Sequence, residues 1–368
     1  MKGQSLTLFG LKTKEVIFDL KDGKISALNV SIYNRGDAGV MSERAFKKQL
    51  DDVQDKIQQF AGTKNRPQSQ RATMDDSKLR SMLWRTNDSD IVLKWSISKD
   101  LPEYINIDFY RPGESPKDLK SGIKTTVASS ALPSLVKHES DGSNYMLIPM
   151  VDQGAKGYCV AATVERILRY YGSNIDQHVI ATLAKSDAQK GTNINKIIDV
   201  LESNSGKLGI RFKPLYRYEL DNYDDLKKMI KYYNAAARRE KADKIDLDDY
   251  ISNRRFDFGR MMKSMNFKVF KEVRARETRD NKLFLEEIKK SIDNGIPLCW
   301  STFIFPSLKD TSSNEFGMHM RIITGYNSKT GEIIFSDSWG AGHEKKTLKD
   351  SDAWAITVNL VSLEPRRR

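Results

Sequence analysis

Apolar residues recur at alternating positions in two short segments near the start of the chain, 16–18 and 25–32, and the segments 90–97 and 104–110 also have strand character. Such alternation is typical of strands with one buried face. The dipeptide Asp22-Gly23 separates the first two segments and predicts a hairpin. Apolar residues at helical spacing from Ser42 to about Phe60 predict an amphipathic helix. The order strand, strand, helix, strand, strand predicts a small α+β domain.

A polar segment rich in Pro, Gly and Ser runs from Arg111 to about Asn144 and is typical of a connection. The length of 368 residues exceeds what one core usually organises, so we expect two domains. Residues 216–263 are highly charged and helix-prone, which predicts an inserted pair of surface helices. The predicted organisation is an N-terminal domain of unknown role at 1–125, a linker at 126–144 and a second domain at 145–368.

The composition narrows the class of protein. Charged residues make up 30% of the chain and hydrophobic residues 39%, as in a globular protein. The net charge is +12, but basic and acidic residues are interleaved, so we expect no nucleic-acid partner. No apolar run approaches the roughly 18 residues of a membrane span. No signal-peptide core follows Met1, so a secreted or periplasmic location would require that a signal segment has been removed.

The two cysteines, Cys159 and Cys299, cannot build a disulfide framework, and neither has zinc-ligand spacing to a second cysteine. Cys299 lies in a short apolar run, which predicts a packed core thiol. His138 and His178 lack ligand-like neighbours, and His343 is interpreted as a loop histidine. No dinucleotide or phosphate-binding fingerprint is present, so we expect no cofactor and no metal.

Cys159 is followed by apolar residues on one helical stripe as far as Tyr171, and Gly172 is a stop signal. The pattern therefore predicts a helix that begins at Cys159. A helix N-terminus favours an anion, which lowers the pKa of a thiol and raises the fraction of nucleophilic thiolate. Gln153 precedes Cys159 by six residues across a loop that contains Gly157. Its amide can donate to a developing oxyanion beside the backbone N–H of Cys159.

A second pattern of chemical interest lies between Gly317 and Gly340, where two apolar segments flank a Gly-containing turn and predict a hairpin. Opposed residues of an antiparallel hairpin have a constant sum of positions, which makes His319 and Asp337 opposite or diagonal neighbours on one face. A carboxylate held against an imidazole fixes its tautomer and stabilises its charged form. Together with Cys159, these residues predict a nucleophilic Cys, His and Asp triad.

These residues resemble the motifs of the papain-like cysteine peptidases. That family combines a Gln, a Cys six residues later at the head of a buried helix, a distant His on a strand, and an Asn followed by Ser-Trp-Gly. The matching positions here are Gln153, Cys159, His319 and Asp337 to Gly340. The resemblance implies a papain-like fold, with a helical and an antiparallel β subdomain, and a peptide or protein substrate. We assign substrate binding to Gly157, Tyr158 and Trp339.

Two departures from papain point to a narrower group. The third triad residue is Asp337 instead of Asn, and the surroundings of Cys159 lack the papain pattern. Both features, with Tyr170-Tyr171-Gly172 at the helix end, are similar to the bacterial double-glycine leader peptidases of bacteriocin exporters and their stand-alone relatives. The resemblance covers about the last 220 residues. Because papain-like enzymes use Asn at this position, it implies that Asp337→Asn retains appreciable activity.

Two other functions remain open from the sequence. Transglutaminase-like acyltransferases and amidases also use Cys, His and Asp, although the Gln before the Cys and the Ser-Trp-Gly after Asp337 favour a peptidase. A protein that keeps the fold and only binds peptides is the second alternative, and the complete triad argues against it. The oligomeric state follows from no sequence feature.

Overall fold

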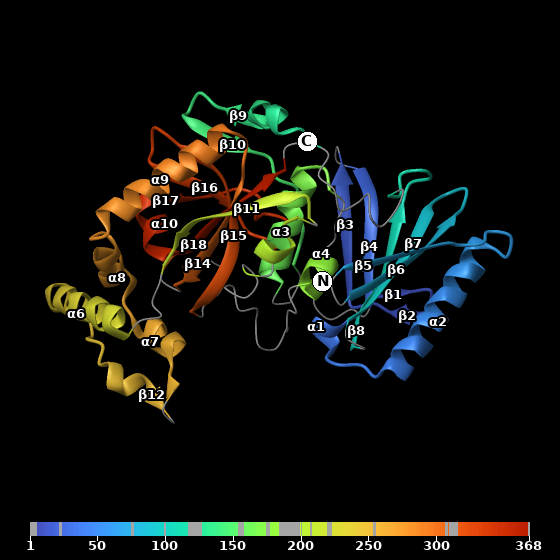
Figure 1. Ribbon diagram of the computed structural model, residues 1–368, viewed down its shortest axis with the longest axis horizontal. Helices are drawn as coiled ribbons and strands as arrows, with labels where there is room; N and C mark the ends of the chain where they lie inside the picture. Colours follow the sequence, from blue (N-terminus) through green and yellow to red (C-terminus); the bar gives the residue numbers. More distant parts are fainter. Residues whose placement is uncertain are drawn as a thin grey trace. The chain divides into compact units, whose positions relative to one another are not determined.

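The computed structural model describes residues 6–21, 24–74, 77–98, 101–116, 127–153, 158–173, 177–183, 199, 201–206, 208–218, 223–252, 255–305, 308 and 316–366. The chain divides into two compact units, coloured along the sequence in Figure 1. Unit 1 comprises Met1–Thr126 and Val151–Gly209, and unit 2 comprises Val127–Met150 and Ile210–Arg368. This grouping places Val151–Gly209 with the N-terminal residues, whereas the sequence assigned these residues to the second domain. Contacts alone do not test which parts fold independently, so the predicted domain boundaries stay a prediction.

Unit 1 contains a six-stranded antiparallel sheet in the order β3-β4-β8-β7-β6-β5. The hairpin of β3 and β4 and the strands β7 and β8 confirm the four predicted segments, whereas β5 and β6 were not predicted; the turn residues Asp22 and Gly23 lie outside the described residues. The strands are β3 (Glu15–Lys21), β4 (Lys24–Asn34), β5 (Gln68–Met74), β6 (Ser77–Arg85), β7 (Asp90–Ser98) and β8 (Leu101–Tyr110). A small ribbon of β1 (Thr7–Leu8) and β2 (Leu11–Lys12) precedes them.

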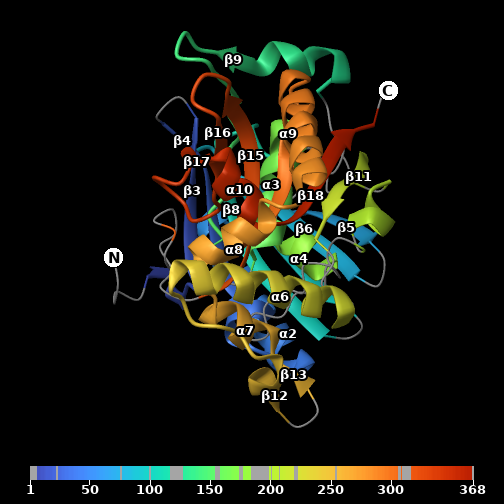
Figure 2. The same ribbon diagram turned by 90° about the vertical axis from the view of Figure 1, so that its left-hand side faces the viewer.

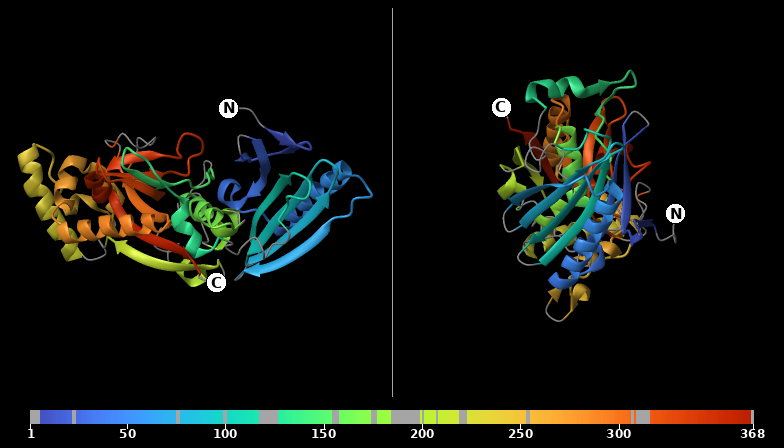
Figure 3. Two further views of the ribbon diagram at one scale, coloured as in Figure 1. Left: turned by 90° about the horizontal axis from the view of Figure 1, so that it is seen from above. Right: turned by 90° about the vertical axis from the view of Figure 1, so that its right-hand side faces the viewer.

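The predicted amphipathic helix is α2 (Glu43–Ala61), which lies along one face of this sheet (Figure 3). Its N-terminus is capped by Ser42, whose hydroxyl accepts a hydrogen bond from the backbone N–H of Ala45. Residues at helical spacing are buried and meet apolar residues of the central strands in one core. These residues are Phe46, Leu50, Val53 and Ile57 of α2, with Val30, Ile91, Leu93, Ile105 and Ile107 of the sheet.

Unit 1 also holds α1 (Arg35–Ala38), α3 (Cys159–Tyr170) and α4 (Gln177–Leu183). The structure confirms that a helix begins at Cys159 and ends before Gly172. Gly172 has a φ of +80°, the left-handed conformation that glycine adopts at low cost after a helix. Nearly every side chain of α3 after Cys159 is buried, so the helix is a core element of its unit.

Unit 2 contains an eight-stranded antiparallel sheet that follows the order β11-β18-β14-β15-β10-β9, with β16 on β15 and β17 on β16. The strands are β9 (Val136–His138), β10 (Ser143–Met146), β11 (Ile210–Arg217), β14 (Leu298–Ile304), β15 (Gly317–Asn327), β16 (Glu332–Ser336), β17 (Lys346–Lys349) and β18 (Thr357–Pro365). The segment predicted as a linker therefore supplies η2 (Ser129–Leu135), β9 and β10 to unit 2. The pairing of β10 with β15 requires a glycine at position 325, because a Cβ there would lie 2.3 Å from the carbonyl oxygen of Asn144 on β10.

Helices of unit 2 gather beside α6 (Tyr223–Glu240), which runs next to α8 (Phe267–Arg274) in Figure 2. One face of α6 is buried, with Leu226, Met229 and Tyr233 among its members, so this charged helix is more than a surface appendage. The remaining elements are η3 (Leu247–Tyr250), β12 (Ile251–Ser252), β13 (Arg255–Phe256), α7 (Phe258–Ser264), α9 (Thr278–Asp293) and α10 (Asp350–Ile356). Helices and antiparallel sheets in both units agree with the predicted α+β class.

Candidate active site

Cys159 is the first residue of α3, and its thiol is half-buried and not part of a disulfide. The first turn of α3 carries no acidic side chain that would repel a thiolate. The peptide dipoles of the twelve-residue helix favour negative charge at this end. The position at a helix N-terminus is the predicted one, and the reactivity of Cys159 stays a prediction.

Tyr158, directly before Cys159, is held by a buried chain of hydrogen bonds. Its hydroxyl donates to Oδ1 of Asn34 at 2.7 Å, and Nδ2 of Asn34 lies 2.6 Å from Nδ1 of His178. An amide nitrogen can only donate, so Nδ1 of His178 accepts. Asn34 ends β4 and His178 lies on α4, so these hydrogen bonds tie the residue before Cys159 to the N-terminal sheet.

Gln153 is buried, with 7% of its surface exposed. The carbonyl of Asp152 accepts a hydrogen bond from Nε2 of Gln177 at 3.0 Å. The backbone N–H of Gln177 in turn donates to the carboxylate of Glu165 on α3 at 2.6 Å. These bonds fix the segment that carries Gln153 to α3 and α4. Gly157, predicted to bind substrate, lies outside the described residues.

In unit 2, β15 and β16 form the predicted hairpin. Ile322 pairs with Ser336, so Asp337, the next residue, comes opposite Arg321 and diagonal to His319. The prediction allowed opposite or diagonal neighbours, and the diagonal arrangement is the one found. Nε2 of His319 lies 3.4 Å from Oδ1 of Asp337, and both side chains are almost completely buried.

Asp337 is surrounded by basic side chains. Nε of Arg321 lies 3.1 Å from its Oδ1, Nζ of Lys346 lies 2.8 Å from its Oδ2, and Nδ1 of His343 lies 4.0 Å from Oδ2. Burial by itself would raise the pKa of Asp337, but the close approach of His319 and the charge of Arg321 outweigh it, with a further contribution from Lys346. The net effect holds the pKa well below its ordinary value, so the carboxylate is ionised at neutral pH.

Trp339 covers the imidazole of His319. The two rings are stacked, with centroids 4.3 Å apart and planes inclined by 15°. The ring of His343 contacts Trp339 edge-on, with the two centroids 5.5 Å apart. Stacking restricts rotation of the imidazole. The sequence predicted that Trp339 binds substrate; the contact found in the structure is with His319, and substrate binding by Trp339 stays a prediction.

Sequence reasoning missed several residues that organise these groups. Arg321 offered a signal, because a lone Arg inside an apolar strand needs a buried anion beside it. Asn34 and Lys346 offered none, since each meets its partner through the fold. Cys299 is buried as predicted, and burial raises the pKa of its thiol to about 12. Within the described residues, no group of His, Cys, Asp and Glu could hold a metal ion. Nor does any helix there have the length and apolar character needed to cross a membrane.

The comparison with protein families gives a match in the second half of the chain. Residues 226–361 match the model of the Peptidase_C39 like family. This segment contains His319 and Asp337, and it does not reach Cys159 or Gln153. The match covers less than half of the chain and supports a cysteine peptidase, hence a hydrolase, at the level of the family. Among curated proteins, none matches the chain.

Proposed function

We propose that the protein is a cysteine peptidase with a papain-like fold, in which Cys159 is the nucleophile, His319 its base, Asp337 the residue that orients this base, and Gln153 an oxyanion donor. The observation that carries the proposal is the buried pair of His319 and Asp337 under Trp339. It lies within the segment that matches a peptidase family. Burying a polar pair this deeply costs free energy, so such a pair is found where it has a function or where other interactions offset the cost.

The contact between His319 and Asp337 supports an assignment of the two ring nitrogens. Asp337 faces Nε2, so Nε2 carries the proton of the neutral ring and Nδ1 is the atom that exchanges protons with the thiol. A carboxylate kept ionised also stabilises the imidazolium once Nδ1 has taken the thiol proton. The result is a thiolate and imidazolium pair, the reactive form of a Cys–His nucleophile.

The reaction then follows from these roles. The thiolate of Cys159 attacks the peptide carbonyl carbon, and the negative charge moves to the oxygen, which accepts hydrogen bonds from the amide of Gln153 and the N–H of Cys159. The imidazolium of His319 protonates the departing amine, which leaves a thioester. Water then attacks the thioester while Nδ1 takes its proton, and the acid product leaves with Cys159 restored.

Substrate binding is assigned to residues beside these groups. We place Gly157 and Tyr158 on the nucleophile side and Trp339 on the base side of the scissile bond. The buried hydrogen bond of Tyr158 leaves its backbone in a fixed position for an extended peptide to contact. The similarity to double-glycine leader peptidases makes a peptide with two small residues before the scissile bond the first substrate to try.

Labelling with an epoxysuccinyl inhibitor of cysteine peptidases, followed by mass mapping, tests the proposal. The expected result is one adduct on Cys159, none on Cys299, and a strong decrease in labelling rate for His319→Ala. Cys159→Ser is the matched control and should take up no label. A folded protein whose Cys159 reacts no faster than a free thiol would contradict the peptidase and favour a peptide-binding relative.

A further inference from the structure

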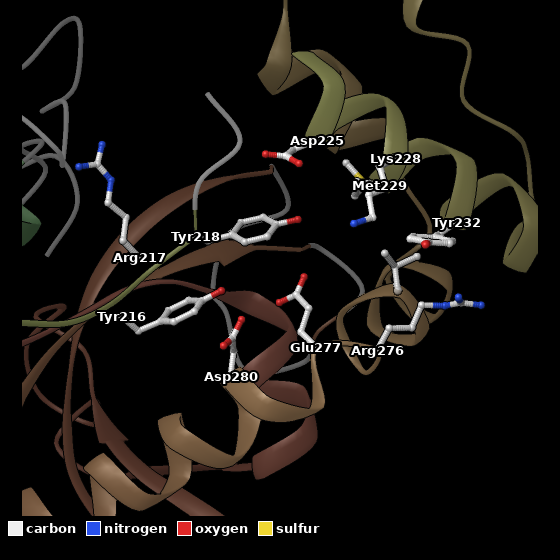
Figure 4. A pocket seen from close by; sticks show the side chains of 11 residues that line it. Tyr216, Arg217, Tyr218, Asp225, Lys228, Met229, Tyr232, Arg276, Glu277 and Asp280 are labelled. Carbon is white, nitrogen blue, oxygen red and sulfur yellow. The ribbon is translucent and has the colours of Figure 1, made fainter. Parts of the chain in front are cut away.

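A cavity of about 460 Å³ in unit 2 lies between β11, α6 and the start of α9 (Figure 4). Among the residues that the structure describes, three basic and three acidic side chains line it. Their charges balance, so the cavity favours neither an anionic nor a cationic ligand. The loop between β16 and β17, in contrast, places His343 beside Asp337, and the proposed chemistry gives this histidine no role.

His343 closes this loop through its backbone. Its carbonyl oxygen accepts hydrogen bonds from the N–H of Asp337 at 3.1 Å and from the hydroxyl of Ser336 at 2.9 Å. Its own N–H donates to the carbonyl of Gly340 at 3.2 Å. The chain can turn back sharply because Gly340 and Gly342 have φ values of +81° and +88°, in the left-handed region that favours glycine. The backbone of His343 is therefore fixed directly beside that of Asp337.

The side chain of His343 reaches both groups that hold the proposed base. Its Nδ1 lies 4.0 Å from Oδ2 of Asp337, and its ring contacts Trp339 edge-on, with centroids 5.5 Å apart. Asp337 approaches Nε2 of His319, and Trp339 stacks on the imidazole of His319. One side chain thus lies against both the carboxylate and the indole that restrict His319.

The ring nitrogen of His343 that faces Asp337 is itself buried. Although 24% of the side chain is exposed, Nδ1 is shielded and has no hydrogen-bond partner among the described residues. A buried polar atom without a partner is uncommon, and 4.0 Å is too long for a hydrogen bond. The acceptor within reach is Oδ2 of Asp337, to which Nζ of Lys346 already donates at 2.8 Å. His343 can therefore serve as a second donor to the same oxygen.

We propose that His343 is a positioning residue for His319, a role that rests on the proposed function. With the proton of the neutral ring on Nδ1, its N–H dipole points at Oδ2 and limits rotation of the Asp337 carboxylate. The edge of the same ring limits the tilt of Trp339 over His319. Together the two contacts keep Nε2 of His319 against Asp337 and leave its Nδ1 for proton exchange with the thiol. His343 takes no part in the proton transfers themselves.

Three variants separate the two contacts. His343→Phe keeps a ring beside Trp339 and removes Nδ1, His343→Asn keeps a polar atom near the place of Nδ1 and removes the ring, and His343→Ala removes both. In the active enzyme, His343→Ala should lower kcat about ten- to a hundredfold with KM nearly unchanged, because displacing a reacting group by about 1 Å can cost about a hundredfold. His343→Phe and His343→Asn should each retain more activity. His138→Ala, which removes an exposed histidine from β9 of the same unit, is the matched control and should retain full activity.

Nitrogen NMR of the histidine-labelled protein reports on the His319 ring without relying on activity. We expect the tautomer with the proton on Nε2 in the wild type, and faster exchange of this proton with water in His343→Ala because the ring is held less firmly. Loss of the signal in His319→Ala identifies it, and His138→Ala should leave it unchanged. Circular dichroism checks that each variant is folded. If His343→Ala does not fold, His343→Phe, which removes Nδ1 alone, supplies the same comparison.

The two measurements separate this proposal from the proposed function. An unchanged His319 signal in the folded variants would overturn the positioning role, whether or not the protein cleaves peptides. Wild-type kcat for His343→Ala in an active enzyme would overturn it as well. A changed signal in a protein that neither cleaves peptides nor takes up the epoxysuccinyl label would contradict the peptidase and still support positioning of His319 by His343.

Discussion

The segment before Cys159 and the strand that carries His319 are fixed by different kinds of interaction. Tyr158 is held by hydrogen bonds among uncharged groups, through Asn34 and His178. His319 is held by a carboxylate that Arg321 and Lys346 also contact. One arrangement orients groups without charge, and the other keeps a charge in place inside the protein.

The difference has consequences for mutation. A neutral buried hydrogen bond contributes about 1 kcal/mol net, whereas removing one partner of a buried ion pair costs about 3–5 kcal/mol because the other charge is left unpaired. The surroundings of His319 should therefore tolerate substitution less than those of Cys159. The buried charge also bears on the expectation that Asp337→Asn retains appreciable activity. That expectation came from papain-like enzymes and did not include Arg321, which lies beside Asp337 here.

Asp337→Asn should have the largest effect on stability. The neutral amide leaves the fully buried Arg321 without its anion, so we expect a loss of about 3–5 kcal/mol in the free energy of unfolding, measured with urea. The double variant Arg321→Met with Asp337→Asn should lose less than Asp337→Asn alone, because no buried charge remains unpaired. If the double variant is instead the less stable of the two, the charges do not control this region.

Gln153→Ala tests the catalytic contribution of the nucleophile side. Removing one donor to the oxyanion should lower kcat by about 10²–10³-fold and leave KM almost unchanged. Gln153→Glu should be at least as damaging, because an ionised carboxylate cannot donate and repels the oxyanion. Alkylation of Cys159 by iodoacetamide serves as the control and should persist. An unchanged kcat on a good peptide substrate would remove Gln153 from the proposed mechanism.

The pH dependence of stability tests the charged arrangement directly. The lowered pKa of Asp337 stabilises the folded state above the unfolded-state pKa of about 3.9, and this contribution is lost as pH falls through the folded-state pKa. Because the Asp337 carboxylate stays ionised in the folded protein well below pH 4, Lys346→Met should lower the free energy of unfolding by about 1 kcal/mol at both pH 7 and pH 4. Lys349→Met is the control, since Lys349 pairs with Glu332 at the surface. A deficit of Lys346→Met that disappears at pH 4 would contradict the lowered pKa of Asp337 and with it the charge argument.

Tyr158→Phe should have the smallest effect on stability, roughly 0.5–1 kcal/mol, because it removes one neutral hydrogen bond. It should also change the rate at which Cys159 is alkylated, because the residue before the thiol loses its anchor. Tyr33→Phe removes a comparable bond to the carbonyl of Gly39 in the same unit. If both variants alter alkylation equally, Tyr158 contributes stability alone and does not position the thiol.

Elements with a strong apolar period were predictable from the sequence. The helices α2 and α3 and the hairpin of β15 and β16 each show their pattern within about twenty consecutive residues, so local spacing specifies them. The proximity of His319 and Asp337 followed from the same hairpin. Their role in catalysis was predicted by resemblance and stays a prediction.

Elements that depend on distant partners were not predictable. β10 has a polar sequence, and it becomes a strand by pairing with β15, which lies far along the chain. Asn34 likewise meets Tyr158 across 124 positions, and no local pattern connects them. β5 is rich in polar residues and lacks alternation, so only its pairing with β6 defines it. In each case the fold, through long-range contacts, supplies information that a window of sequence does not contain.

Because the thiol of Cys299 is buried, it can be used to measure what fraction of a sample is folded. With its pKa raised to about 12, this thiol stays protonated and shielded at neutral pH, so a reagent applied to the native protein reports on Cys159 alone. After unfolding, both cysteines react. The ratio of thiols modified before and after denaturant therefore measures, in one sample, the fraction of molecules that are folded and carry an accessible Cys159.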